Sequence, residues 1–241
     1  ASPATYQLWI RQPGAFSGGP AGDTSRIQDA DNDTFVEVEG AADDDNFGFD
    51  VALSNDGSRV AVGAKSNNSG GSYAGQVRIF DESNSTWVQA GGAINGEATE
   101  DESGESISIS SNGKRVAIGA SFNDGNGDSA GHVRIFRETI NGDWVQIGAD
   151  IDGEAAGDYS GFSVSLSNSG KRVAIGAQAN SGNGLYSGQV RIFEEENGEW
   201  SQIGDNIYGE AHHDGNGIAT ALSKDGLRIV IGAYANDGNG M

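Results

Sequence analysis

The chain of 241 residues repeats one pattern at spacings of 56 or 57 residues. A six-residue block, Arg-Val-Ala-Ile-Gly-Ala or a close variant, begins at Arg59, Arg115, Arg172 and Arg228. A second block, Val-Arg-Ile-Phe, occurs in the same phase at 77–80, 133–136 and 190–193. A fixed period of this kind indicates an architecture in which each unit buries its apolar face against its neighbour. The repeat therefore limits the chain to an array of one small structural unit.

Each repeat contains four segments that predict short antiparallel strands. The first alternates apolar and polar residues, as at 107–110, and a tight turn such as 224–226 joins it to the second, the Arg-Val-Ala-Ile-Gly-Ala block. A loop rich in Gly and Asn, such as 123–127, leads to the third strand, Val-Arg-Ile-Phe, and the fourth begins at a tryptophan such as Trp144. Four antiparallel strands in a repeat of this length predict a blade of an all-β propeller.

The strand count predicts one propeller domain over residues 1–241. The first two strands of the repeat occur four times, and the last two occur three times plus a degenerate N-terminal copy at 6–10 and 34–37. If the chain ends meet, they complete one blade between them and close a ring of four, whereas a fragment of a larger ring is the alternative. The predicted boundaries are 1–38 for the N-terminal strands with an insertion at 11–33, then 39–95, 96–152 and 153–208 for complete repeats, and 209–241 for the C-terminal strands.

The hairpin at 47–64 carries a family resemblance. Its sequence, Phe-Gly-Phe-Asp-Val-Ala-Leu-Ser-Asn-Asp-Gly-Ser-Arg-Val-Ala-Val-Gly-Ala, resembles the FG-GAP repeat of integrin alpha-chain propellers and of tandem arrays in secreted microalgal and bacterial proteins. The resemblance covers most of residues 40–241 and implies a propeller with an adhesive or scaffolding role. Two features depart from it: Phe-Gly occurs only at 47–48 among the repeats, and the family's acidic calcium loop is absent from the hairpin. Integrin-like ligand binding is therefore not expected.

Charge and cysteine content exclude several classes of partner. With 35 acidic residues against 14 Lys and Arg, the formal net charge is −21, which disfavours nucleic acid and anionic lipid surfaces. No apolar run approaches the roughly 20 residues of a membrane-spanning helix. The chain has no Cys, which excludes thiol catalysis, thiolate zinc sites and disulfides. The 39 Gly follow no Gly-X-Y period and indicate many tight turns.

Two groups of residues are candidate cation sites. Asp29, Asp31 and Asp33 lie at alternate positions of one loop, which is the spacing that opens an EF-hand, so Ca²⁺ is the cofactor this loop would hold. Because Thr34 follows instead of Gly and no Glu stands at the twelfth position, a solvated acidic loop is the favoured alternative. The second group could line a cation site or form turns, and turns are favoured. It consists of Asp124, Asn126, Asp237 and Asn239.

Two sets of side chains recur in phase with the repeat. The four block arginines recur with Glu97, Glu154 and Glu210, and a structural Arg–Glu pair within each blade is favoured over an anion-binding ring. Three tryptophans could stack on sugar rings, although packing between blades is favoured. They are Trp87, Trp144 and Trp200.

Catalysis finds no support in the sequence. The histidines are His132, His212 and His213, and His132 replaces a Gln of two sister repeats, which suggests a surface position. No residue departs from the repeat as a nucleophile would, so we expect no enzyme. Three sequons permit glycosylation, and they lie at Asn32, Asn67 and Asn84.

These observations predict a non-enzymatic extracellular module, secreted or at the cell surface, that serves adhesion or forms a repeating unit of a surface assembly. Its partners would be another protein, a second copy of itself, or a glycan. A carbohydrate-binding propeller with one shallow site per blade is the alternative. A hydrolase is third, and it would require a deep pocket with a carboxylate pair or a metal.

Overall fold

The structure is a computed structural model that describes residues 7–10, 36–84 and 86–236. The described residues form nineteen β-strands and no helix. Accordingly, no helix in this part of the chain is long and apolar enough to span a bilayer. The prediction of an all-β fold is confirmed.

The first complete sheet follows the predicted strand order. Four strands pair antiparallel, each with the next along the chain. They are β3 (Phe47–Leu53), β4 (Arg59–Ala64), β5 (Gln76–Ser83) and β6 (Thr86–Gln89). The turn between β3 and β4 needs a left-handed residue, and Gly57 supplies it at φ +74°. A fifth strand of two residues, β7 (Ile94–Asn95), pairs with β5. This short strand has no counterpart in the prediction.

Two further sheets repeat this arrangement. The second sheet contains β8 (Ser106–Ile109), β9 (Arg115–Ala120), β10 (His132–Glu138), β11 (Trp144–Gln146) and β12 (Ile151–Asp152). The third contains β13 (Ser160–Leu166), β14 (Arg172–Ala177), β15 (Gln189–Glu196), β16 (Glu199–Gln202) and β17 (Ile207–Tyr208). In both, four strands pair in order and the short last strand joins the third, as in the first sheet. Repeated four-stranded antiparallel sheets are compatible with a propeller-like repeat fold.

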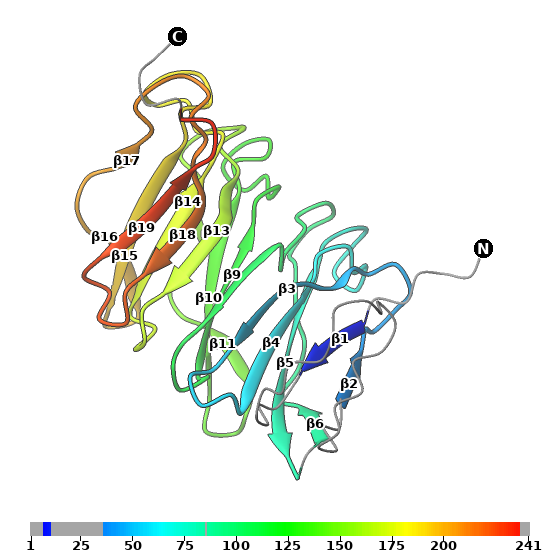
Figure 1. The fold of residues 1–241 in the computed structure, drawn as a ribbon. Coiled ribbons are helices and arrows are strands. Elements are labelled where there is room, and N and C mark those ends of the chain that lie inside the picture. Colours follow the sequence, from blue (N-terminus) through cyan, green and yellow to red (C-terminus); the bar gives the residue numbers. More distant parts are fainter. Residues whose placement is uncertain (1–6, 11–35, 85, 237–241) are drawn as a thin grey trace, which may run out of the picture.

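The two ends of the chain each form a two-stranded sheet. Near the N-terminus β1 (Gln7–Ile10) pairs with β2 (Val36–Glu39), and near the C-terminus β18 (Asn216–Leu222) pairs with β19 (Ile229–Ala233). Figure 1 shows these pairs at opposite ends of the row of sheets. Among the described residues β19 pairs only with β18, so the predicted joining of the two ends is not seen.

Close contact between successive sheets forms the core. Residues of the second strand of each complete sheet are almost entirely buried, such as Ala117 and Ile118 in β9. A Cβ atom on Gly119 of β9 would lie 2.0 Å from the carbonyl oxygen of Gly161 in the next sheet, so only glycine allows this approach. The Nε1 of Trp144 donates to the carbonyl of Ala90, 3.0 Å away in the preceding sheet. Trp200 repeats this bond with Ile147, also at 3.0 Å. Tryptophan packing between repeats is thereby confirmed for Trp144 and Trp200.

The block arginines bind different partners from those predicted. Arg59 pairs with Asp81 of its own sheet and lies 2.9 Å from Glu138 of the next. Arg115 pairs with Glu195 of the next sheet, and Arg172 pairs with Glu194 of its own. The predicted pairing of these arginines with Glu97, Glu154 and Glu210 is therefore wrong for the three arginines of complete sheets. The reason is register: Arg59 faces Asp81 at one end of the sheet, whereas Glu97 follows β7, which pairs at the other end.

Candidate functional site

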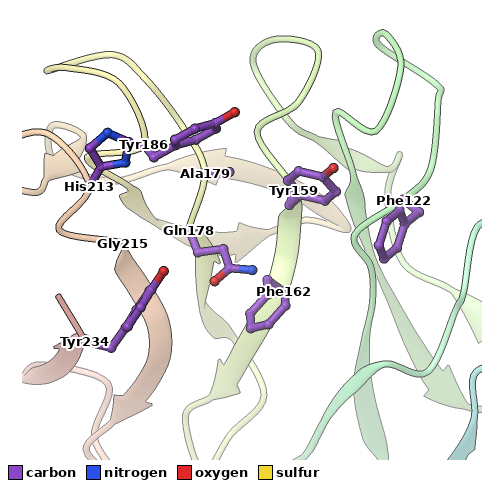
Figure 2. Close-up of a pocket in the computed structure, with 9 residues that line it drawn as sticks. All are labelled: Phe122, Tyr159, Phe162, Gln178, Ala179, Tyr186, His213, Gly215 and Tyr234. Carbon is purple, nitrogen blue, oxygen red and sulfur yellow. The ribbon is translucent and has the colours of Figure 1, made fainter.

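A pocket of about 310 Å³ lies at one rim of the molecule, between the second sheet, the third sheet and the β18–β19 pair. It is built by the loops that follow the second strands and by the loops that precede the first strands. Figure 2 shows the side chains around it. Its lining is aromatic to an unusual degree and consists of Phe122, Tyr159, Phe162, Gln178, Ala179, Tyr186, His213, Gly215 and Tyr234. We call this the aromatic pocket.

Loop geometry positions three of the rings. Tyr159, Tyr186 and His213 all have positive φ angles, between 53° and 66°, which non-glycine residues adopt at an energetic cost. The two loops that carry Tyr186 and His213 are tied together, because His213 N donates to the carbonyl of Leu185 at 2.8 Å. The amide of Leu185 in turn donates to Nδ1 of His212 at 3.0 Å. Two hydrogen bonds therefore fix the loop of Tyr186 against the loop of His213.

The rings contact one another in pairs. Phe122 and Tyr159 meet edge to face with centroids 5.2 Å apart, and Tyr186 and His213 are tilted at 5.5 Å. Tyr234, directly after β19, is 71% exposed. Figure 2 shows the amide of Gln178 extending among these rings toward Phe162. The polar groups of the lining are this amide, the imidazole of His213 and the hydroxyls of the three tyrosines.

None of the nine lining residues carries a carboxylate. The acids next to them in sequence, Asp158 and Asp214, are buried and bind backbone instead. Asp158 Oδ2 accepts from the amide of Ala155 at 3.0 Å, and Asp214 Oδ2 accepts from the amide of Ala211 at 2.9 Å. The lining also lacks Ser, Thr, Lys and Cys, so it offers no hydroxyl, amine or thiol nucleophile apart from the tyrosines.

The equivalent place between the first and second sheets holds an ammonium group. There Lys65 Nζ lies 4.3 Å from the ring centroid of Phe49 and pairs with Glu102 at 2.7 Å and Glu105 at 3.4 Å. Burial opposes the charge, but the hydrogen bond to Glu102 and the two negative charges raise the pKa of Lys65. Four positions of the repeat frame correspond between the two places. In the aromatic pocket they hold Gln178 for Lys65, Phe162 for Phe49, and Gly215 and Ile218 for the two glutamates.

Several predicted site residues lie outside the described residues. These are the metal candidates Asp29, Asp31 and Asp33, the binding candidates Asp237 and Asn239, and the sequon residue Asn32. The described candidates Asp124 and Asn126 take part in local bonds. Asp124 Oδ1 accepts from the amide of Ser129 at 2.8 Å, and Asn126 Nδ2 donates to the carbonyl of Gly153 at 2.7 Å. Both hydrogen bonds are of the kind expected if these residues form turns, which is the favoured alternative to a cation site.

The two described sequons differ in access. Asn67 is 1% exposed, and its Oδ1 accepts from the amide of Ser69 at 2.9 Å. Asn84 is exposed in the turn between β5 and β6. A glycan on Asn67 would require its amide to leave the interior, whereas Asn84 offers its side chain directly. Glycosylation stays a prediction.

Sequence reasoning missed the pocket and misplaced one histidine. His132 opens β10 and is buried, so the expected surface position was wrong. His213, which the sequence left without a role, lines the pocket. A signal was available: Tyr159, Phe162 and Tyr234 are aromatic where sister repeats hold Glu102, Glu105 and Lys65. That signal needs the loops to be placed side by side, which the repeat alone does not do.

Comparisons with known proteins give a weak structural likeness. No protein-family model matches the chain. No curated protein matches it either. Among solved structures, it is similar to a crystal structure named as a putative 6-phosphogluconolactonase from Bacteroides uniformis ATCC 8492, with TM-score 0.49 and 14% identity. The match covers 76% of this chain and 47% of that one, so the chain spans about half of that protein.

This comparison contradicts two predictions. The similar structure has the name of an enzyme, so the prediction of a non-enzymatic adhesion or structural module is corrected, and so is the expectation that the chain is not an enzyme. Neither the described residues nor the comparison supports adhesion or carbohydrate binding. The FG-GAP family is not shown. At this identity and TM-score the likeness brings no reaction and no substrate to the chain.

Proposed function

We propose that the aromatic pocket binds the quaternary ammonium group of a small organic cation. The observation that carries this proposal is the Lys65 ammonium over the Phe49 ring, because Phe162 presents a ring at the equivalent place without a lysine. An aromatic face attracts a cation through its quadrupole, by about 0.5–2 kcal/mol for each ring. Several rings around one cavity can each contribute this attraction to the same cation.

The lining favours a quaternary ammonium over a primary one, because it holds no carboxylate. A primary ammonium has three N–H donors that need acceptors, and at Lys65 two glutamates supply them. Beside the aromatic pocket these positions are Gly215 and Ile218, so neither carboxylate is kept. A quaternary ammonium has no N–H to satisfy and loses little hydration when it enters.

The net charge of the protein also favours the binding of cations. A formal net charge of −21 raises the local concentration of cations near the surface and repels anions. The charge does not specify a ligand. The rings of the pocket provide that specificity.

Calorimetric titration with choline tests the proposal, with dimethylbutanol as its uncharged isostere. We expect saturable choline binding about tenfold tighter than dimethylbutanol binding, since only choline gains the cation–π attraction. Phe162→Leu keeps an apolar side chain but removes the ring, and it should weaken choline binding. Gln178→Lys should abolish binding, because the new ammonium would occupy the pocket as Lys65 occupies its own site.

Lys65→Gln is the matched control, since it alters the equivalent place and leaves the pocket intact. Choline binding should be unchanged in this variant. Equal binding of choline and dimethylbutanol, or full choline binding by Gln178→Lys, would overturn the proposal.

We also propose that the chain ends meet to complete a fourth blade of a propeller. Two observations support this: β18–β19 lacks the last two strands of a repeat, and β1–β2 stands in the predicted place of such a pair. Val230 of β19 is 72% exposed, whereas its counterparts Ala61, Ala117 and Ala174 in the complete sheets are fully buried. Closure would cover this side chain and remove an open sheet edge. Alanine substitution at Gly232 tests this closure.

A further inference from the structure

Three ligating side chains converge at the edge of the second sheet, away from the aromatic pocket. They are Glu97 after β7, His132 at the start of β10 and Asp150 before β12. One imidazole nitrogen and one oxygen of each carboxylate lie within 4.8 Å of one another. His132 Nδ1 is 3.7 Å from Asp150 Oδ2. The chain thus brings together one nitrogen and two oxygen ligands from three separate segments.

The imidazole is buried without a full set of partners. His132 is 1% exposed, and among the described residues its Nε2 has no hydrogen-bond partner. A buried polar atom without a partner is costly, so such an atom calls for an explanation. Burial and the neighbouring Arg134 charge lower the pKa of His132. A neutral imidazole is the form that binds metals.

At the third sheet the same three positions hold one carboxylate and two amides instead of two carboxylates and an imidazole. They hold Glu154, Gln189 and Asn206. Gln189 Nε2 donates to Glu154 at 2.6 Å, and Asn206 Nδ2 donates to it at 3.1 Å. The carboxylate there is satisfied by two amides. In the second sheet His132 and Asp150 replace these two amides. The set there therefore has more acceptor atoms and fewer donors.

Charge around the set is negative. The carboxylates of Glu97 and Asp150 each bring an oxygen into the set, within 4.8 Å of each other. Arg134 Nη1 lies 3.3 Å from Glu97 Oε1. Asp101 and Asp152 add further negative charge around His132. A divalent cation between the carboxylates would relieve their repulsion.

We propose that Glu97, His132 and Asp150 bind a divalent first-row transition metal, for which Zn²⁺ is the probe. Imidazole nitrogen with carboxylate oxygen suits this class, whereas Ca²⁺ takes oxygen ligands and more of them. Zinc–ligand distances of about 2.0–2.2 Å require the three groups to draw closer. Glu97, with its side chain 46% exposed, has the freedom to move. The proposal is independent of the aromatic pocket.

Zinc titration by calorimetry, followed by the visible absorption of the Co²⁺-substituted protein, tests the site. We expect one Zn²⁺ per chain and Co²⁺ bands typical of a site with nitrogen and oxygen ligands. His132→Gln and Asp150→Asn should each lose this binding. Both restore the side chains of the third sheet, so both should fold, and circular dichroism checks that they do.

His213→Asn is the matched control, because it removes a histidine outside the set and disrupts the adjacent His212–His213 pair. It should retain the zinc site. Unchanged zinc binding by His132→Gln, or loss of binding in His213→Asn alone, would place any zinc elsewhere and overturn the proposal. Absence of Zn²⁺ and Co²⁺ binding by the unaltered protein would overturn it as well.

Discussion

A single carboxylate closes the turn between β3 and β4. Asp56 Oδ1 accepts from the hydroxyl of Ser54 at 2.7 Å and from the amide of Ser58 at 3.1 Å. These bonds lower the pKa of Asp56 to about 2. Because the folded state binds this proton more weakly than the unfolded chain, the stabilisation is complete above pH ~4 and is lost as the pH falls through about 2.

Asp56→Asn isolates this effect, since Asn112 makes the same two kinds of bond in the next hairpin. We expect a small change in unfolding free energy at pH 7. The advantage of the aspartate over the asparagine should shrink between pH 5 and 2.5. Urea unfolding of both proteins across this range measures it, and a constant difference would contradict the assignment.

Individual residues also mark the limit of sequence reasoning. The Asn-Asp-Gly turn was predictable because its bonds are local. The burial of His132 was not, since a histidine in place of Gln76 or Gln189 looks like a surface change until the strand is placed in its sheet. The aromatic pocket depended in the same way on loops from distant repeats.

At the scale of strands, glycines set the distance between sheets. A Cβ atom on Gly176 of β14 would lie 2.0 Å from the carbonyl oxygen of Gly217. Ser163 Oγ lies at 2.4 Å and could turn away, but the backbone of Gly217 has no such freedom. Gly176→Ala should therefore cost about 2–4 kcal/mol of unfolding free energy. Gly92→Ala is the matched control, because nothing lies within 4 Å of its added Cβ and its φ is ordinary. Thermal and urea unfolding compare the two, and equal stability would refute the close approach.

Most strands were predictable because alternation and tight turns are local signals. The order of the four strands in each complete sheet followed from the repeat. The short strands β7, β12 and β17 were not predicted, since two residues carry no alternation. They form because the chain passes beside the third strand on its way to the next repeat, which is a property of the folded sheet.

At the scale of the molecule, the number of strands could be predicted from the sequence, but the relative position of the two chain ends could not. Strand number follows from local pattern, whereas closure depends on the small rotation between successive sheets summed over the whole array. In each complete sheet a glycine of the second strand lies against the next sheet, and a Cβ atom added to Gly63 would lie 2.2 Å from the carbonyl oxygen of Gly104. Gly232 of β19 is the exception, because its added Cβ would meet nothing closer than 3.4 Å.

Gly232→Ala therefore distinguishes a closed ring from an open row. In a closed ring Gly232 would face the backbone near Gly48, the counterpart of Gly104, and the added methyl would clash as at Gly176. We expect Gly232→Ala to lose about 2–4 kcal/mol of unfolding free energy, since we propose closure. A variant as stable as Gly92→Ala would show that nothing lies against β19 there, and the ends would then remain apart in solution. The measurement is urea unfolding of both variants beside the unaltered protein.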